Sequence, residues 1–360
     1  MRLGLWIVPL HPPDRPLWST LDENIEKSLL ADELGFDELW VGEHTSASSQ
    51  PIPSPLMFLG HVLARTRTLT FGTAVINLPN RHPAIVAAEA AQFDHLSKGR
   101  FMLGVGPGGL ASDFELFDVP DPGVRHRMVV EGVDFIQRIW SQDPPYDLAG
   151  EFWHVRISER VLPELGIGYL PKPFQRNGPP ISVSVASLNS AAARTAAQRG
   201  WGMLSAHTIG TDAVASHWAI YCEACAATGR VPRGEGWRVA RNVLVAPSDA
   251  EARDRAFTER GANHYFYQYL HDAQRALGVA DPMTAVGMTE QYAIHGSPRT
   301  VLDKLIAFRD RVGPFGGLMI TGLDWSGPNK DWESQSMRLL AHDVMPKFRQ
   351  HVRACAPGSI

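Results

Sequence analysis

The sequence alternates between short apolar segments and longer amphipathic ones from end to end, and this alternation limits the fold more than any other feature. Eight apolar segments have the length and composition of buried strands. They are residues 3–10, 37–44, 69–78, 100–107, 180–186, 201–207, 237–247 and 315–323. The segments between them carry apolar residues every three or four positions, which is typical of helices packed on one face. The clearest of these later helices are expected at 189–199, 212–228, 249–277 and 332–352.

Eight such repeats predict an α/β fold of the (β/α)₈ TIM-barrel type, in which the parallel strands close into a ring. The chain has 360 residues, whereas a barrel of this type typically needs about 250. We therefore expect one domain over 1–360 with insertions at approximately 141–180 and 260–298. In such a barrel the functional residues lie at the carboxyl ends of the strands.

Charge and cysteine content exclude several other classes of protein. The formal net charge is −4, which does not favour nucleic acid as a partner because phosphate binding requires concentrated positive charge. No apolar stretch predicts a membrane helix or a signal peptide, so we expect a cytoplasmic protein. Cys222 and Cys225 form a C-x-x-C pair without the second pair that a zinc site would need, and we expect no metal.

A G-x-G-x-x-G motif at Gly104, Gly106 and Gly109 resembles the dinucleotide fingerprint, but its context is wrong. The fingerprint passes directly into a helix, and it opens the first βαβ unit of its fold. Here Pro107 interrupts the motif, and the motif follows the fourth expected strand. We interpret these glycines as positions where backbone approaches a flat ligand closely, or as an ordinary loop.

Three ordered segments support a resemblance to a known family. They are "GFDELWVGEHTS", "GTAVINLPNRHP" and "SKGRFMLGVGPG", and the similarity extends from the first strand to the last helix. The chain resembles the luciferase-like flavin monooxygenases, and within them the oxygenases of the limonene and diketocamphane type, with which it shares segments such as "IWSQDPPYDLAGEFWHV".

The resemblance implies a two-component enzyme that uses reduced FMN, supplied by a separate flavin reductase, together with dioxygen. Through a flavin 4a-hydroperoxide it would oxygenate an apolar organic substrate such as a terpenoid ketone or an aromatic natural product. A homodimer is also implied. Two alternatives stay open: a deazaflavin-dependent hydride-transfer oxidoreductase of the same superfamily, and a non-catalytic flavin-binding subunit.

The resemblance also implies the residues of the site. His44 ends the second strand and would relay protons at the flavin, because imidazole titrates near neutral pH; the alternative is a structural histidine. Ala74 would lie beneath the flavin ring together with Thr73, with the Thr73–Ala74 peptide bond in the cis form or as an ordinary trans bond. Gly106 and Ala186, at the ends of the fourth and fifth strands, would lie against the same ring.

The flavin phosphate would bind where the fifth strand ends. Ser187 and Ser190 match the hydroxyl donors of the family, and the following helix offers free backbone N–H groups. Ordinary helix capping by Asn189 or Ser190 is the alternative. Arg127, or its neighbour Arg125, would reach the same phosphate from the fourth helix. The alternative for Arg127 is a surface ion pair with Glu131.

Two departures and one aromatic run concern the pocket. Pro107 and Ala206 stand where luciferase has an arginine and a tryptophan, which suggests a roomier pocket. The run at 263–270 lies in the segment corresponding to the family's lid, and it would either cover the pocket or belong to the core.

Overall fold

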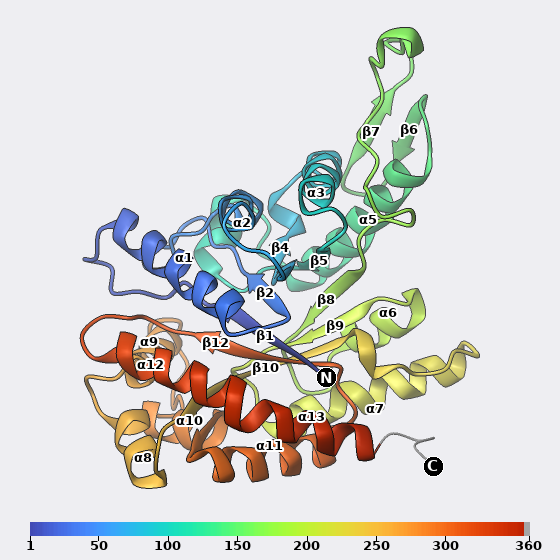
Figure 1. The fold of residues 1–360 in the computed structure, drawn as a ribbon. Helices are drawn as coiled ribbons and strands as arrows, with labels where there is room; N and C mark the ends of the chain where they lie inside the picture. The colour runs from blue at the N-terminus through green and yellow to red at the C-terminus, as the bar shows by residue number, and fades with distance from the viewer. Residues whose placement is uncertain (356–360) are drawn as a thin grey trace.

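A computed structural model describes residues 1–355, and it contains a closed barrel of eight parallel strands (Figure 1). The last strand pairs with the first over six residues, from Arg2 opposite Gly317 to Ile7 opposite Gly322, and this pairing closes the ring. The barrel strands are β1 (Arg2–Ile7), β2 (Glu38–Val41), β3 (Thr70–Thr73), β5 (Phe101–Gly106), β8 (Ile181–Val185), β9 (Gly202–Ser205), β10 (Trp237–Val245) and β12 (Gly317–Gly322). The predicted fold class is confirmed.

Helices surround the ring and follow the order expected from the sequence. In chain order they are α1 (Leu17–Glu33), α2 (Pro55–Leu63), α3 (Pro83–Ser97), α5 (Pro122–Ser141), α6 (Ala191–Arg199), α7 (Thr211–Ala227), α11 (Pro298–Val312), α12 (Asn329–Leu339) and α13 (Met345–Ala354). Their ends carry ordinary signals. For example, the Ser297 hydroxyl accepts a hydrogen bond from the Thr300 N–H and Pro298 occupies the first turn of α11.

Two long predicted helices are interrupted. The segment 249–277 forms α8 (Asp249–Phe257) and α9 (Ala262–Ala276), with the turn between them ending at Gly261. The segment 332–352 begins earlier, as α12, and a π-helical turn at Leu340–Val344 separates it from α13. The helical periodicity continues through both breaks, so the pattern by itself predicted single helices.

The regions expected as insertions contain structure of their own. Between α5 and β8, an antiparallel hairpin of β6 (Tyr146–Ala149) and β7 (His154–Ile157) projects away from the barrel (Figure 1). After α9 come α10 (Ala285–Tyr292) and a short strand, β11 (Ala293–Gly296), which pairs with β10. The two-residue strand β4 (Ile76–Asn77) pairs with β5, and α4 (Ala111–Leu116) follows β5. Segments this short show no periodicity that the sequence could have revealed.

The amino end of the barrel interior is closed by a buried ion pair. Arg238 donates from Nη2 to Glu38 Oε1 at 2.6 Å and from Nε to Glu38 Oε2 at 3.1 Å, and Trp40 Nε1 donates to the same carboxylate at 2.9 Å. Above it lie Trp40, Leu204, Ala240 and Met319. The Trp40 ring fits because Gly72 has no side chain: a Cβ there would lie 2.2 Å from the ring. Side chains therefore fill this end of the barrel interior in the described residues, and the cavity described below lies at the other end.

Within residues 1–355, no helix is both long enough and apolar enough to cross a membrane.

Candidate functional site

A cavity occupies the carboxyl-terminal mouth of the barrel, where the fold predicts function. It contains about 820 Å³ of empty space, part of it continuous with solvent. Its walls combine apolar side chains with small residues. They are Trp6, Ile7, Val8, Pro9, Gly42, Glu43, His44, Gln50, Ala74, Val75, Asn77, Gly108, Gly109, Ser184, Ala186, Leu204, Ser205, Ala206 and Met319. His44, Ala74 and Ala186 are thus brought together as expected.

The segment after β3 contains a non-prolyl cis peptide bond between Ala74 and Val75. The cis bond was predicted at Thr73–Ala74, one residue before its position in the structure, so the predicted position was wrong. Thr73 itself is buried and does not face the cavity: its hydroxyl donates to the Gly104 carbonyl at 2.7 Å and accepts from the Gly104 N–H at 2.9 Å. Thr73 therefore fastens β3 to β5, and Ala74 and Val75 form the cavity wall.

The glycines of the G-x-G-x-x-G motif have different surroundings. A Cβ on Gly104 would lie 1.8 Å from the Thr73 carbonyl oxygen, and one on Gly106 would lie 2.5 Å from the Ser184 hydroxyl. Gly109 lines the cavity, whereas Gly106 stands behind Ser184 and does not. The first two glycines thus permit close packing of the protein on itself, and only the third borders space for a ligand.

His44 lies three residues beyond the end of β2, and its side chain is about one quarter exposed (24 %). Its Nδ1 is 3.5 Å from Asp113 Oδ2, which is within ion-pair distance but makes no hydrogen bond in the described structure. Burial lowers the pKa of His44, and the Asp113 carboxylate opposes that shift. The sequence did not reveal Asp113, because it lies in α4, 69 residues further along the chain.

Asp113 also fixes the loop that carries His44. Its carboxylate accepts from the Ser46 N–H at 2.8 Å and from the Ser46 hydroxyl at 2.6 Å, and the Thr45 N–H lies 3.2 Å away. A buried carboxylate bound in this way holds the loop in one conformation. The position of the imidazole therefore depends on a contact between the loops after β2 and β5.

Glu43, the neighbour of His44, is nearly buried beside the cavity. Its Oε1 accepts from the Asn77 N–H at 2.7 Å, while its Oε2 has no hydrogen-bond partner in the described structure. Desolvation raises the pKa of Glu43 to about 7, although the Asn77 N–H and the Arg81 guanidinium, 3.8 Å away, act in the opposite direction. The bond between Glu43 and Asn77 connects two wall segments.

A second cavity of about 870 Å³ lies where α6 begins, and Ser184 lines both cavities. Ser187 and Ser190 line it, as the expected phosphate site requires. Ser190 precedes the first turn of α6 and is 9 % exposed, yet its hydroxyl makes no capping bond. The alternative of ordinary helix capping by Ser190 is therefore wrong.

Arg127 does not line this second cavity. Its Nη2 donates to Glu151 Oε1 at 2.9 Å and its Nε to Glu151 Oε2 at 3.2 Å, with both side chains 55 % exposed. The surface ion pair thus forms, but with Glu151 and not with Glu131. The latter accepts instead from the backbone N–H groups of residues 151–153. An exposed arginine pairs with a carboxylate that the fold places near it. Here that carboxylate belongs to Glu151, in the turn of the β6–β7 hairpin.

Comparison with known proteins identifies the family. The family model described as luciferase-like monooxygenase matches residues 1–313. The chain is 30 % identical to 4-hydroxyprotoasukamycin monooxygenase from Streptomyces nodosus subsp. asukaensis, over 97 % of this chain and 92 % of that protein.

This chain is a luciferase-like monooxygenase.

A solved structure and a further sequence relative agree with this assignment. The oxygenating constituent of 3,6-diketocamphane monooxygenase from Pseudomonas putida, a type II Baeyer–Villiger monooxygenase in complex with FMN, superposes with a TM-score of 0.86 at 27 % identity, covering 96 % of this chain and 98 % of that one. The oxygenase component of flavin-dependent trigonelline monooxygenase from Acinetobacter baylyi is 25 % identical over 97 % of this chain and 96 % of that protein.

In this luciferase-like monooxygenase the aromatic run at 263–270 lies in α9. Phe266 and Tyr267 are buried with Leu10 and Leu323 in a small cluster beside the mouth, and neither lines the cavity. The core alternative fits these two residues. Phe266 contacts His207, whose ring also meets the edge of Trp6 at a centroid distance of 4.7 Å.

Sequence reasoning missed His207. It directly follows the wall residue Ala206, and both of its ring nitrogens are buried without a partner in the described structure. Burial lowers the pKa of His207 to about 3, and the nearby Arg241 charge acts in the same direction. The available signal was a histidine two residues beyond the end of a barrel strand. The sequence does not indicate whether a side chain at that position points towards the cavity or towards the surrounding helices.

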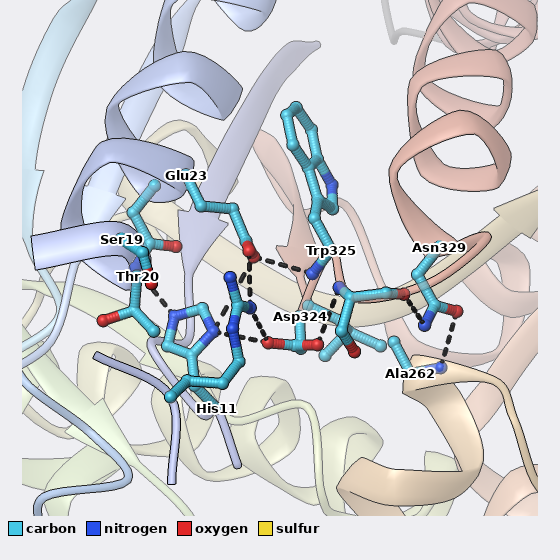
Figure 2. A network of polar contacts seen from close by, with 12 residues as sticks. His11, Ser19, Thr20, Glu23, Ala262, Asp324, Trp325 and Asn329 are labelled. Carbon is cyan, nitrogen blue, oxygen red and sulfur yellow. Dashed lines mark hydrogen bonds and ion pairs between the residues drawn. The ribbon is translucent and has the colours of Figure 1, made fainter. Parts of the chain in front are cut away.

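A polar network holds the loop after β1 at the mouth (Figure 2). His11 Nδ1 lies 2.7 Å from Asp324 Oδ1, and Arg15 bonds both Asp324 and Glu23. His11, Glu23 and Asp324 are close enough together to hold a metal ion, but the Arg15 guanidinium already lies against both carboxylates. The network therefore serves to join this loop, which carries the wall residues Val8 and Pro9, to the loop after β12.

Proposed function

We propose that the protein is the oxygenase component of a two-component system that uses reduced FMN and dioxygen to oxygenate an apolar organic substrate. One observation carries the proposal: Ser184 separates a mouth cavity with small wall residues from a second cavity lined by hydroxyls. A flavin mononucleotide has the same two parts, a flat ring and a phosphate at the end of a chain.

The residues present fit that cofactor. Ala74, Gly109 and Ala186 line the mouth cavity with small or absent side chains, which leaves room for a flat ring. Ser187, Ser190 and the first N–H groups of α6 suit a phosphate, since a helix amino terminus favours an anion. When bound, FMN supplies the redox chemistry that activates dioxygen, and the protein binds, orients and protects it.

His44 is the residue placed to move a proton. Its imidazole lines the cavity, and burial holds its pKa below the ordinary value, so the neutral form predominates near neutral pH. Asp113 holds the loop of His44 and stabilises the imidazolium whenever a proton arrives. We assign His44 the exchange of a proton at the reacting centre and Asp113 the role of positioning residue.

The substrate class follows from the remaining wall. Trp6, Ile7, Val8, Leu204 and Met319 present apolar surface at the mouth, which favours an apolar substrate such as a terpenoid ketone or an aromatic natural product. The named relatives that act on a diketocamphane and on trigonelline agree with a small organic substrate. A flavin reductase partner, a homodimer and a cytoplasmic location remain predictions.

The deciding experiment mixes the protein with photoreduced FMN without oxygen, and then with oxygenated buffer in a stopped-flow spectrometer. We expect oxidised FMN to reappear more slowly than it does without protein, and a substrate to lower the yield of hydrogen peroxide. Reoxidation at the rate of free FMN would contradict the proposal. A parallel titration with reduced deazaflavin then tests the hydride-transfer alternative.

A further inference from the structure

The second cavity contains no permanently charged group to neutralise a phosphate. Its walls are Pro107, His126, Val129, Val130, Val183, Ser184, Ser187, Asn189, Ser190, Ala191, Ala192, Thr195 and Trp201. Neither lysine nor arginine occurs among these residues. His126 is the one titratable side chain in the wall.

The arginines near the cavity are engaged elsewhere. Arg125, one residue before His126, donates to the Val119 and Pro120 carbonyls and lies over the Phe114 ring. Arg127 is held by Glu151, and Arg199 at the far end of α6 is held by Asp134. Arg138 lies twelve residues beyond His126 on α5, which is about 18 Å along a helix.

The carboxylates around His126 are also occupied. Asp121 caps α5 by accepting from the Val124 N–H at 2.7 Å, and Glu131 accepts three backbone N–H groups of the hairpin turn. Asp134 pairs with Arg199, and Glu151 pairs with Arg127. None of these four carboxylates pairs with His126 in the described structure, so the charge of a protonated His126 is available to a ligand.

Ser190 offers the cavity a second hydrogen-bonding group that no other residue uses. The residue is 9 % exposed, and it lines the cavity. Its hydroxyl neither caps α6 nor bonds to another residue in the described part of the chain. Because Ser190 lines the cavity, a ligand or water there can accept a hydrogen bond from this hydroxyl.

The imidazole of His126 has one nitrogen to spare. Its Nδ1 lies 2.9 Å from the Pro122 carbonyl oxygen, which only accepts, so Nδ1 carries a hydrogen. Nε2 is then an acceptor in the neutral ring and a donor in the protonated ring. Only the protonated ring can donate to a phosphate oxygen.

Resting on the proposed function, we infer that His126 provides the positive charge that binds the flavin phosphate, and that binding of FMN is therefore coupled to uptake of a proton. An adjacent phosphate dianion favours the imidazolium. The affinity for FMN then falls as the pH rises, because the proton must be taken from an increasingly basic solution.

The test compares oxidised FMN with riboflavin, which has the ring but no phosphate. Isothermal titration calorimetry in buffers of different ionisation enthalpy measures both affinity and protons taken up. We expect uptake of a large fraction of one proton with FMN above neutral pH, and none with riboflavin. H126Q should lower the ratio of FMN to riboflavin affinity about tenfold, the size of a charge-assisted hydrogen bond, and abolish the uptake.

H126R should restore the affinity ratio without proton uptake, since guanidinium stays protonated. H342Q, at an exposed histidine in the π-helical turn after α12, should leave both quantities unchanged. An H126Q protein with the parental ratio and uptake would overturn the inference while leaving the proposed function intact. Equal affinity of the parent for FMN and riboflavin would also overturn it, and the stopped-flow result decides the oxygenase function separately.

Discussion

The two ends of the barrel interior treat buried polar groups in opposite ways. At the amino end, the Glu38 carboxylate accepts hydrogen bonds from the Arg238 guanidinium and from the Trp40 indole N–H. At the carboxyl end, buried polar atoms of Trp6, Glu43 and His207 have no partner in the described structure. One polypeptide therefore pairs its polar groups where only stability is required and leaves them unpaired around the cavity.

The difference teaches where to look for function in such a fold. Unsatisfied buried polar atoms are rare in native proteins, and they mark strained or ligand-binding positions. At the mouth they accompany a cavity and a histidine, whereas at the base the polar side chains of Glu38 and Trp40 are bonded to each other and to Arg238. The contrast can be tested with variants at both ends.

The largest effect should come from the mouth, in activity and not in stability. H44N removes the proposed proton carrier, and general acid–base catalysis contributes about 10²–10⁴-fold to rate. We expect product formation from an accepted ketone or terpene to slow by that factor, while urea denaturation changes little. A fall in the free energy of unfolding that parallels the lost activity would instead assign His44 a structural role.

At the base, breaking the ion pair should cost stability. R238M leaves Glu38 buried without its partner, which we expect to lower the free energy of unfolding by about 3–5 kcal/mol. R127M, which breaks the exposed pair with Glu151, is the matched control and should cost much less, because solvent screens an exposed ion pair. Urea denaturation measures both, and equal losses would contradict the assignment of the base to stability.

The pH dependence of stability should distinguish Glu43. Because burial raises its folded-state pKa to about 7 from an unfolded value of about 4.3, its protonated form is favoured in the folded protein. Its penalty is absent at low pH and grows as pH rises from about 4 to about 7. E43Q should therefore become progressively more stable than the parent over this range, by up to about 3 kcal/mol. Denaturation curves at several pH values test this, and a constant difference would refute it.

The smallest effect should come from His207. H207F retains the aromatic shape and removes two nitrogens that have no partner in residues 1–355, and such a replacement is close to neutral or stabilising. We expect the free energy of unfolding to change by less than about 1 kcal/mol, measured as for R238M. A loss as large as that of R238M would mean that the two ends do not differ.

Much of the fold could be predicted because its signals are local. The eight strands and most helices follow from apolar periodicity. The contact of Gly104 with Thr73 was not predicted, because it joins β5 to β3, and the sequence favoured approach to a ligand or an ordinary loop. Short elements such as β11 and the break before α9 carry no such period. Among the site residues, His44, Ala74, Ala186, Ser187 and Ser190 line the two cavities as expected.

The sequence by itself determined the barrel, the order of its strands and the position of His44 near a strand end. These features depend on the hydrophobic periodicity, the length and the order of segments of consecutive residues. Only the tertiary structure decided that Asp113 holds the loop of His44, that Arg127 meets Glu151, and that His126 borders the second cavity. The physical reason is that these contacts join loops from separate βα units. Their partners depend on how the loops pack over the mouth, which no local pattern encodes.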